Sequence, residues 1–270
     1  MIKIFTVDAF TDRPFSGNPA AVCLPHDELN EELMKKIAFE MNLSETAFVT
    51  KHSNGFNLRW FTPKAEVELC GHATLASAHI LWQEKIISKN EEVVFYSMYK
   101  GILKAKKSGS EITLNFPVNK PIPLDKNEIL EKALGVNSVS LHTTDHHYLV
   151  ELNSESELKK VKPDFSLLET LPKYGTIITS KSEDPEYDFK SRFFAPSKGV
   201  KEDPVTGSAH CVLTPFWSEK LGKKKMKAFQ ASERGGALSV ELIDDRVLIS
   251  GNAVTVTAGE FFLQTDSFSE

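Results

Sequence analysis

The sequence lacks the features that assign a chain to several large classes of protein. It contains three cysteines in 270 residues, and Cys23, Cys70 and Cys211 form neither a CxxC pair nor a zinc-ligand spacing. A sparse, odd set of thiols is typical of a reducing compartment, so we expect a cytoplasmic protein. No phosphate-binding loop and no strand-linked GxGxxG occurs. The sequence therefore predicts no metal site and no cofactor.

Basic charge and long apolar runs are also scarce. The formal net charge is −5, and the densest basic run, Lys223–Lys225, is short enough to be a solvated helix end. No segment approaches the ~20 apolar residues of a membrane span. The first residues, Met1–Val7, lack the basic-then-apolar order of a signal peptide. We therefore expect neither a nucleic acid nor a membrane as partner.

What the sequence does contain is an internal repeat. Arg59–Pro63 (RWFTP) is followed by Gly71–Thr74 (GHAT), and about half a chain later Arg192–Pro196 (RFFAP) is followed by Gly207–His210 (GSAH). Each copy runs from an aromatic strand through a loop to a glycine that opens a helix. A spacing this large indicates two related halves. Two such helix N-termini around one cleft would bind a small anion such as a carboxylate.

Hydrophobic periodicity predicts helices at Asp27–Met41, Ala73–Trp82 and Gly207–Leu221. The last two are apolar nearly all round, which is typical of a helix inside a domain. The sequence thus predicts an α+β fold of two pseudo-symmetric halves, each a barrel-like mixed sheet around a central apolar helix. Residues 1–117 form the N-terminal half, which the last residues of the chain can join, and residues 118–270 form the C-terminal half. Strands are expected at Met1–Phe10, Glu45–Thr50, Phe56–Phe61, Glu92–Tyr99, Ile102–Lys106, Glu111–Phe116, Gly175–Ser180, Asp188–Phe194, Leu238–Ile243, Val247–Ser250 and Val254–Leu263.

Five motifs, in order along the chain, carry a family resemblance: Asp8–Thr11 (DAFT), Phe15–Val22 (FSGNPAAV), Ser44–Phe48 (SETAF), Glu68–Thr74 (ELCGHAT) and Asp203–His210 (DPVTGSAH). Together they resemble the phenazine-biosynthesis PhzF-like isomerases, which share their fold with diaminopimelate epimerase and proline racemase. The resemblance covers nearly the whole chain. It implies a homodimer and an active site between two domains. It also implies an isomerase that moves a proton within a small carboxylated metabolite without a cofactor.

The resemblance points to Glu45, His72 and Asp203 as catalytic residues. Glu45 precedes an apolar run, and apolar surroundings raise the pKa of a carboxyl towards the range of a general acid/base. In the second half the corresponding position is Ile178, so a single acid is expected. His72 lies at a helix N-terminus, where the dipole disfavours its charged form. Asp203 either shapes a turn or pairs with His72 or with a substrate amine.

Substrate binding is expected from residues around the two helix N-termini. The backbone near Gly71, Gly207 and Ser208 would bind the carboxylate, because glycine lets a ligand approach the main chain closely. Arg234 would meet a carboxylate with two parallel hydrogen bonds. Asn18, in the second motif, is expected to be a further contact.

Cys70 leaves a different chemistry open. In the epimerase and racemase branches of the fold, a cysteine in this position works with a second cysteine at the other helix. Here the second helix offers no thiol before Cys211, which lies a turn too late. A thiol-dependent amino-acid epimerase or racemase is therefore the second hypothesis, and a non-enzymatic small-molecule-binding protein is the third.

The remaining histidines have plainer interpretations. His79 is expected to be a hydrogen-bonded core histidine within the first apolar helix. His142, His146 and His147 are expected to form a surface cluster and not a metal site.

Overall fold

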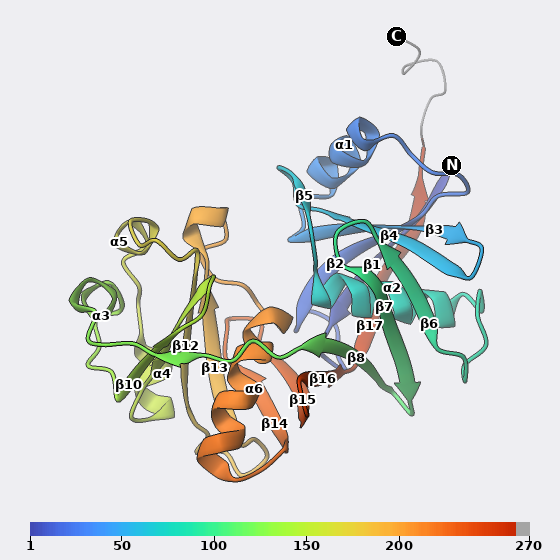
Figure 1. Cartoon of the computed structure of the whole chain (residues 1–270). Helices are drawn as coiled ribbons and strands as arrows, with labels where there is room; N and C mark the ends of the chain where they lie inside the picture. The colour runs from blue at the N-terminus through green and yellow to red at the C-terminus, as the bar shows by residue number, and fades with distance from the viewer. Residues whose placement is uncertain (263–270) are drawn as a thin grey trace. The chain divides into compact units, whose positions relative to one another are not determined.

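The computed structural model describes residues 1–262, and its chain groups into two compact units. Unit 1 consists of Met1–Leu114 together with the chain from Gly251, and unit 2 consists of Asn115–Ser250. Figure 1 shows the strands and helices of each. None of the helices within residues 1–262 is long and apolar enough to cross a membrane.

Unit 1 is a mixed sheet whose neighbouring strands pair in the order β17, β1, β2, β3, β4, β6, β7 and β8. The pairs β2–β3 and β4–β6 are parallel, and the others are antiparallel. The short β5 adds to β4. The bounds are β1 Ile2–Ala9, β2 Asn18–Leu24, β3 Glu45–His52, β4 Gly55–Phe61, β5 Glu66–Val67, β6 Val93–Ser97, β7 Gly101–Ser108, β8 Glu111–Pro117 and β17 Ala253–Phe261.

Unit 2 repeats this arrangement. Its strands pair in the order β9, β10, β11, β12, β13, β14, β15 and β16, with β11–β12 and β13–β14 parallel and the others antiparallel. The succession of parallel and antiparallel pairs is the one seen in unit 1, which confirms the internal repeat. The bounds are β9 Ile122–Pro123, β10 Ser140–Thr143, β11 His147–Glu151, β12 Gly175–Lys181, β13 Phe189–Phe194, β14 Lys225–Gln230, β15 Gly236–Ile243 and β16 Arg246–Gly251.

Each unit has one central helix, α2 (Gly71–Gln83) in unit 1 and α6 (Gly207–Leu221) in unit 2. Nearly every residue of α2 is buried, and the helix packs on β1, β2, β3 and β17, as Figure 1 shows. Helix α6 is buried along most of its length and packs on β14 and β15. The prediction of an α+β fold with two apolar central helices is thus confirmed.

Residues 1–262 contain four shorter helices, and each begins where a side chain accepts a hydrogen bond from a first-turn N–H. For example, Asn30 accepts from Leu33, so α1 begins four residues later than predicted, at Glu31. The bounds are α1 Glu31–Met41, α3 Glu128–Leu134, α4 Glu155–Lys160 and α5 Phe165–Glu169, with a 3₁₀ turn η1 at Pro196–Lys198.

The arginine that opens each repeat copy ties its strand to the loop that follows. Arg59 bonds both carboxylate oxygens of Glu66, at 2.7 and 2.8 Å. Arg192 does the same with Glu202, at 2.7 and 2.9 Å. Each guanidinium also lies over the ring of the phenylalanine two residues later, 5.2 and 5.0 Å from its centroid. This shared bidentate geometry explains why both copies keep Arg-x-Phe.

Candidate functional site

Three reactive side chains of unit 1 converge around the N-terminus of α2. Glu45 is the first residue of β3, Cys70 immediately precedes α2, and His72 lies in its first turn. The Nε2 atom of His72 is 3.1 Å from Oε2 of Glu45. Its Nδ1 atom is 3.5 Å from the sulfur of Cys70. The structure therefore brings together Glu45 and His72, two of the residues that the sequence singles out, and adds Cys70 to the pair.

Asn18 completes this cluster from β2. It is fully buried, and its Nδ2 atom lies 3.1 Å from Nδ1 of His72. The glycine before it is required by the backbone, because Gly17 has a φ of 67° and a Cβ atom there would lie 2.1 Å from the carbonyl oxygen of Ala9. The Gly-Asn pair of the sequence motif thus places Asn18 behind the imidazole.

The pKa of His72 is shifted in the opposite direction to the one that the sequence predicts. Burial by itself would lower the pKa of His72, but the neighbouring Cys70 and the Glu45 carboxylate raise this pKa well above its usual value. The helix dipole argument considered only the backbone and missed the side chains beside the ring. Burial also raises the pKa of the Cys70 thiol to about 11, with the charge of Glu45 adding to the effect. The Glu45 carboxylate therefore favours a proton on the ring of His72, and burial keeps the Cys70 thiol protonated at neutral pH.

Asp203 belongs to a separate polar cluster in unit 2. Its carboxylate accepts a hydrogen bond from the hydroxyl of Thr206, the residue before α6. Gln230 joins the two, because its Nε2 atom donates to the carbonyl oxygen of Asp203 at 2.7 Å and its Oε1 atom accepts from the N–H of Thr206 at 2.8 Å. Thr206 was not predicted, although it lies inside the DPVTGSAH motif. The pairing of Asp203 with His72 stays a prediction.

The two central helices begin without the cap that the shorter helices have. Neither Cys70 before α2 nor Thr206 before α6 forms a hydrogen bond from its side chain to a first-turn N–H. Gly207 is buried and Ser208 is exposed, and Gly71 is half-buried. Arg234 is half-buried in the turn between β14 and β15. The contacts of these residues with a carboxylate remain predictions.

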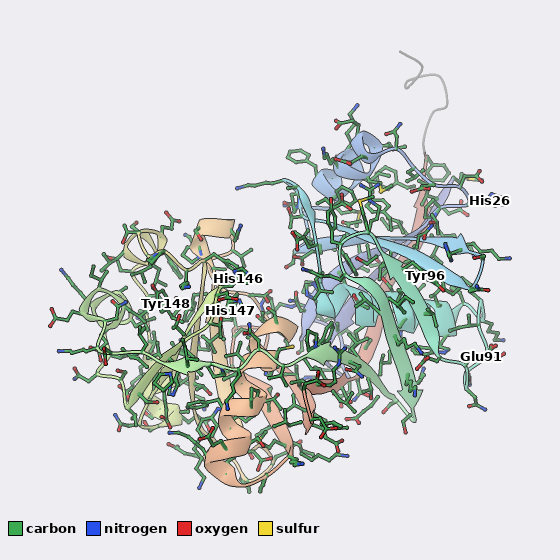
Figure 2. All side chains as sticks on the ribbon, in the orientation of Figure 1. His26, Glu91, Tyr96, His146, His147 and Tyr148 are labelled. Atoms are coloured by element: carbon green, nitrogen blue, oxygen red, sulfur yellow. The ribbon has the colours of Figure 1, made fainter. Side chains whose placement is uncertain are left out.

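Of the three histidines predicted to form a surface cluster, His146 is exposed and His142 is half-buried, but His147 is buried, contrary to the prediction. His147 is only 2 % exposed, and its ring lies 5.2 Å from that of Tyr174 and 5.5 Å from that of Phe193. Neither ring nitrogen has a hydrogen-bond partner within residues 1–262. Figure 2 shows His147 on β11 beside the exposed His146. His146 lies in the bend before β11, whereas His147 is the first residue of β11, in which every residue is buried.

His79 has the role the sequence predicts. Its Nε2 atom lies 3.1 Å from the hydroxyl oxygen of Thr255, so the ring has a polar partner inside unit 1. Burial lowers the pKa of His79 to about 4, and Lys107 contributes in the same direction. The ring is therefore neutral at physiological pH and takes no part in the cluster around Glu45.

The sheet registers identify the position in unit 2 that corresponds to Glu45. In both copies of the repeat, the phenylalanine two residues after the arginine pairs with a threonine, Thr46 in unit 1 and Thr176 in unit 2. The residue before this threonine is Glu45 in one unit and Gly175 in the other. The assignment of Ile178 was therefore wrong, because the two copies differ in loop length. The conclusion that unit 2 has no matching acid holds.

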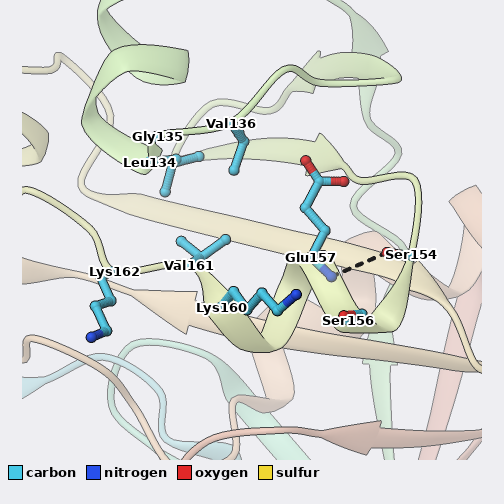
Figure 3. Close-up of a pocket in the computed structure, with 9 residues that line it drawn as sticks. All are labelled: Leu134, Gly135, Val136, Ser154, Ser156, Glu157, Lys160, Val161 and Lys162. Carbon is cyan, nitrogen blue, oxygen red and sulfur yellow. Dashed lines mark hydrogen bonds between the residues drawn. The ribbon is translucent and has the colours of Figure 1, made fainter.

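Unit 2 also has a surface cavity of about 490 Å³ next to α3 and α4. Figure 3 shows its apolar wall of Leu134, Val136 and Val161, with Lys160 and Lys162 at the edge. None of the predicted site residues lines it. The cavity has no concentration of reactive groups, so it is not the candidate site.

The fold and the site together define a class of protein. A mixed-sheet unit repeated around a buried helix is the fold that the resemblance implies for the PhzF-like isomerases, and one copy of it carries the carboxylate–imidazole contact. The chain belongs to the phenazine biosynthesis-like protein family (PhzC-PhzF), whose model matches residues 7–259.

Individual relatives agree with this assignment. An uncharacterized isomerase of Halalkalibacterium halodurans is 50% identical over 262 residues, which cover 96% of this chain and 98% of the relative. The crystal structure of a PhzF-family protein of Enterococcus faecalis is similar with a TM-score of 0.93 at 39% identity, covering 97% of this chain and 99% of that chain. A predicted epimerase of Pseudomonas aeruginosa, with a TM-score of 0.72 at 17% identity over 98% of this chain and 100% of that chain, shares the fold.

These comparisons confirm the family, the epimerase-like fold and the isomerase class that the sequence predicts. The substrate and the roles of Glu45, His72 and Asp203 remain predictions. So do the homodimer and the cytoplasmic location.

Proposed function

We propose that the protein is a cofactor-independent isomerase that moves a proton between two carbon atoms of a small carboxylated metabolite. Glu45 removes the proton and returns it to another carbon on the same face of the substrate. The observation that carries this proposal is the contact of 3.1 Å between Oε2 of Glu45 and Nε2 of His72 in a buried cluster.

The position of Glu45 suits a general base. Its side chain keeps 19% of its surface exposed, so a substrate can reach the carboxylate, while His72 beside it is only 6% exposed. Apart from His72, the buried oxygen Oε2 has no polar partner within residues 1–262. A carboxylate that is reachable and little used in structural bonds is available to take a proton from carbon.

His72 supplies the complementary proton. Burial lowers the pKa of His72, but Cys70 and Glu45 raise this pKa overall, which favours a proton on Nε2 between the ring and the Glu45 carboxylate. Such a ring can donate a hydrogen bond to a substrate oxygen as negative charge develops there. Asn18 fixes the ring from behind, at 3.1 Å from Nδ1, so that Nε2 remains directed towards Glu45.

The uncapped helices support an anionic substrate. The N-terminus of a helix carries partial positive charge and unsatisfied N–H groups. In α2 the residue before the helix does not cap these groups with its side chain, and the same is true of α6. We propose that the N–H groups near Gly71, Gly207 and Ser208 bind substrate carboxylate. Asp203 would hold a polar or amine group of the substrate, and Arg234 would contribute a bidentate contact.

The thiol-dependent epimerase is the competing function, and the contact of Cys70 with His72 at 3.5 Å is the observation in its favour. The active form of a cysteine is the thiolate. Burial raises the pKa of Cys70 to about 11, so the thiol stays protonated at neutral pH. The residue before α6 is Thr206, which cannot act as the second thiol. Both facts favour the carboxylate as the base.

Hydrogen exchange at carbon tests the proposal directly. The protein is incubated in D₂O with a panel of cyclic and unsaturated carboxylic acids, and mass spectrometry detects deuterium in recovered substrate and product. Glu45→Gln keeps the size of the side chain but removes the base, so exchange should fall ~10²–10⁴-fold. Cys70→Ala should keep most of the activity.

A matched control is Glu68→Gln, which removes a carboxylate near α2 that is 66% exposed and paired with Lys100. This variant should behave as wild type. If Cys70→Ala abolishes exchange and Glu45→Gln retains it, the thiol-dependent epimerase replaces the proposed function.

A further inference from the structure

The polar cluster of unit 2 has hydrogen-bond directions that the main chain fixes. Oε1 of Gln230 lies 2.8 Å from the N–H of Thr206, and Nε2 of Gln230 lies 2.7 Å from the carbonyl oxygen of Asp203. A backbone N–H can only donate and a carbonyl oxygen can only accept, so one orientation of the amide satisfies both. Gln230 is completely buried at the end of β14. Turning its amide over would place two donors together at one end and two acceptors at the other.

The orientation of this amide decides where the hydroxyl proton of Thr206 lies. The same Nε2 atom also donates to Oγ1 of Thr206, at 3.1 Å. The hydroxyl therefore accepts from Gln230 and donates its own proton to Oδ2 of Asp203. If Oδ2 carried a proton itself, the buried hydroxyl of Thr206 would lose this acceptor, and a buried donor without a partner is costly. The network thus favours the ionised form of Asp203.

The main chain of Asp203 is held as well as its side chain. Its N–H donates to the carbonyl oxygen of Phe193 in β13, at 3.0 Å, and its carbonyl oxygen accepts from Gln230 in β14. Asp203 itself is only half-buried. Contacts from two strands and from the residue before α6 therefore fix a carboxylate that a substrate can reach.

The internal repeat supplies a comparison for the helix side of this network. Thr206 corresponds to Cys70, because each directly precedes the glycine that opens its central helix. Three residues before them, unit 2 has Asp203 and unit 1 has Val67. Unit 1 therefore forms its central helix with neither a hydroxyl nor an acid at these two positions.

The counterpart of Gln230 differs in the same way. The sheet registers pair Tyr96 of β6 and Phe229 of β14 with the residues two positions before the repeat arginines. The next residues along these strands, Ser97 and Gln230, therefore correspond to each other. The Ser97 hydroxyl accepts from the N–H of Lys100 in its own turn, at 3.4 Å. Because unit 1 folds without the network, the repeated fold does not by itself explain it in unit 2.

We propose that Gln230 and Thr206 are positioning residues that hold Asp203 as a carboxylate, so that Asp203 meets the substrate as a hydrogen-bond acceptor and not as a proton donor. Gln230 acts through the hydroxyl of Thr206 and through the main chain of Asp203. The statement about the substrate rests on the proposed function. The ionised state of Asp203 in the free protein does not.

Carbon-13 NMR tests the network without any substrate. The whole protein is labelled at the side-chain carboxyl carbons of its aspartates, Asp203→Asn identifies the signal of Asp203, and this signal is followed from pH 8 to pH 4. Thr206→Val keeps the shape of the side chain but removes the hydroxyl. The midpoint for Asp203 should therefore rise by about one pH unit, which corresponds to a tenfold weaker acid. Thr206→Ser retains the hydroxyl and should titrate as wild type does.

A second variant and a matched control accompany this titration. Gln230→Met removes the amide that orients the hydroxyl of Thr206, so the midpoint for Asp203 should shift in the same direction. Thr214→Val removes another buried hydroxyl of α6, which bonds the carbonyl oxygen of His210 at 2.6 Å, and should leave this midpoint unchanged. All of these variants keep the charged residues beside the network, namely Lys201, Glu202, Glu233 and Arg234.

The refuting result is a midpoint for Asp203 that does not move in Thr206→Val. Circular dichroism verifies that each variant is folded. If Thr206→Val does not fold, an unmoved midpoint in Gln230→Met refutes the proposal in its place.

Deuterium exchange at carbon separates this proposal from the proposed function. On the panel acid that the wild-type protein exchanges fastest, Thr206→Val should slow exchange about tenfold or more, and Thr206→Ser should restore it. If Asp203→Asn exchanges as wild type does while Thr206→Val shifts the midpoint, the proposed role of Asp203 fails and the network stands. If Asp203→Asn loses exchange while Thr206→Val changes neither the midpoint nor the rate, the network fails and the proposed function stands.

Discussion

The buried ring of His147 should make the stability of the protein depend on pH in a defined window. Burial lowers the pKa of His147 to about 4, and the neighbouring His146 contributes in the same direction. In the unfolded chain the pKa is near the ordinary value of 6.5. Between these values the unfolded state binds a proton that the folded state does not, so the free energy of unfolding falls as the pH falls.

The magnitude follows from the two pKa values. Each pH unit between 6.5 and about 4 costs ~1.4 kcal/mol for one histidine, which amounts to ~3 kcal/mol over the whole window. Above pH 6.5 both states are neutral and the effect vanishes. Below pH 4 both states are protonated and the loss no longer grows. The ring faces Tyr174 and Phe193 and has no hydrogen-bond partner within residues 1–262, so nothing described there would stabilise its charged form.

Urea unfolding of wild type and His147→Leu at several pH values measures the effect. The variant removes the titrating group, so the difference in stability between the two proteins should change by ~1.4 kcal/mol per pH unit between pH 6.5 and 4. The difference cancels contributions from other groups, including the half-buried His79 and the buried His210, whose pKa values are lowered to about 4 as well.

His26→Gln is the matched control, because the His26 side chain is almost fully exposed. Its difference from wild type should not vary with pH. A His147→Leu difference that stays constant from pH 6.5 to 4 would show that the ring is protonated in the folded protein and that the reasoning is wrong.

Two further predictions concern charged pairs of unit 2. Glu155→Gln should lower the free energy of unfolding by ~3–5 kcal/mol in urea titrations. The substitution removes the carboxylate that pairs with the ammonium of Lys190 at 2.8 Å, and the side chains of Glu155 and Lys190 are only 6% and 8% exposed. Burial alone would raise the pKa of Glu155, but hydrogen bonds from Lys159 and Lys190 lower this pKa to about 2. The contribution of the ion pair to the free energy of unfolding is therefore fully present above the ordinary pKa of 4.5 and is lost as the pH falls towards 2. Arg192→Lys should cost ~1–3 kcal/mol by the same method, since an ammonium cannot reproduce the two parallel bonds to Glu202. A loss below half a kcal/mol in either variant would show that the pair is structurally dispensable.

The elements that sequence reasoning found share a strong local signal. Helix α6 was predicted with both ends correct, and the sequence explains why: Gly207 opens it, and Gly222, with a φ of 65°, ends it. Strands β3 and β4 were found from runs of β-branched and aromatic residues. In contrast, the C-terminal strand was predicted as Val254–Leu263, and β17 is Ala253–Phe261, with Leu263 beyond the described residues.

The missed elements are those that long-range contacts create. Strand β2 is absent from the predicted strands, because Gly17 and Pro19 suggest a turn, whereas Asn18–Leu24 pairs with β1 and β3. Most of the segment between residues 126 and 172 was left without elements. Its short helices are stabilised by caps and packing more than by periodicity. The elements not predicted were β2, β9, β10, β11, β14, α3, α4 and α5, together with the two-residue β5.

The candidate site was predictable only in part for the same reason. Motifs identified Glu45 and His72, but their contact depends on β3 lying next to the N-terminus of α2, which no local pattern states. The sequence raises Cys70 only as one thiol of a two-cysteine mechanism, and its position 3.5 Å from the imidazole appears only in the fold. The pKa of His72 likewise depends on its neighbours, so a prediction from the helix dipole had the wrong sign.

The sheet registers explain why chemistry is confined to one copy of a repeated fold. In unit 1, Ala20 of β2 pairs with Glu45 of β3, and the small methyl group leaves room for the carboxylate. In unit 2 the corresponding pair is His147 of β11 and Gly175 of β12. A Cβ atom at Gly175 would lie 2.4 Å from Cδ2 of His147, so the imidazole fills the space that an acid would need. In unit 1 the first strand of the pair carries the small residue and the second the large one, whereas in unit 2 the first strand carries the large residue and the second the small one. An acid could enter unit 2 only if the histidine became small at the same time, and a single substitution at either position therefore cannot make the protein symmetric in function.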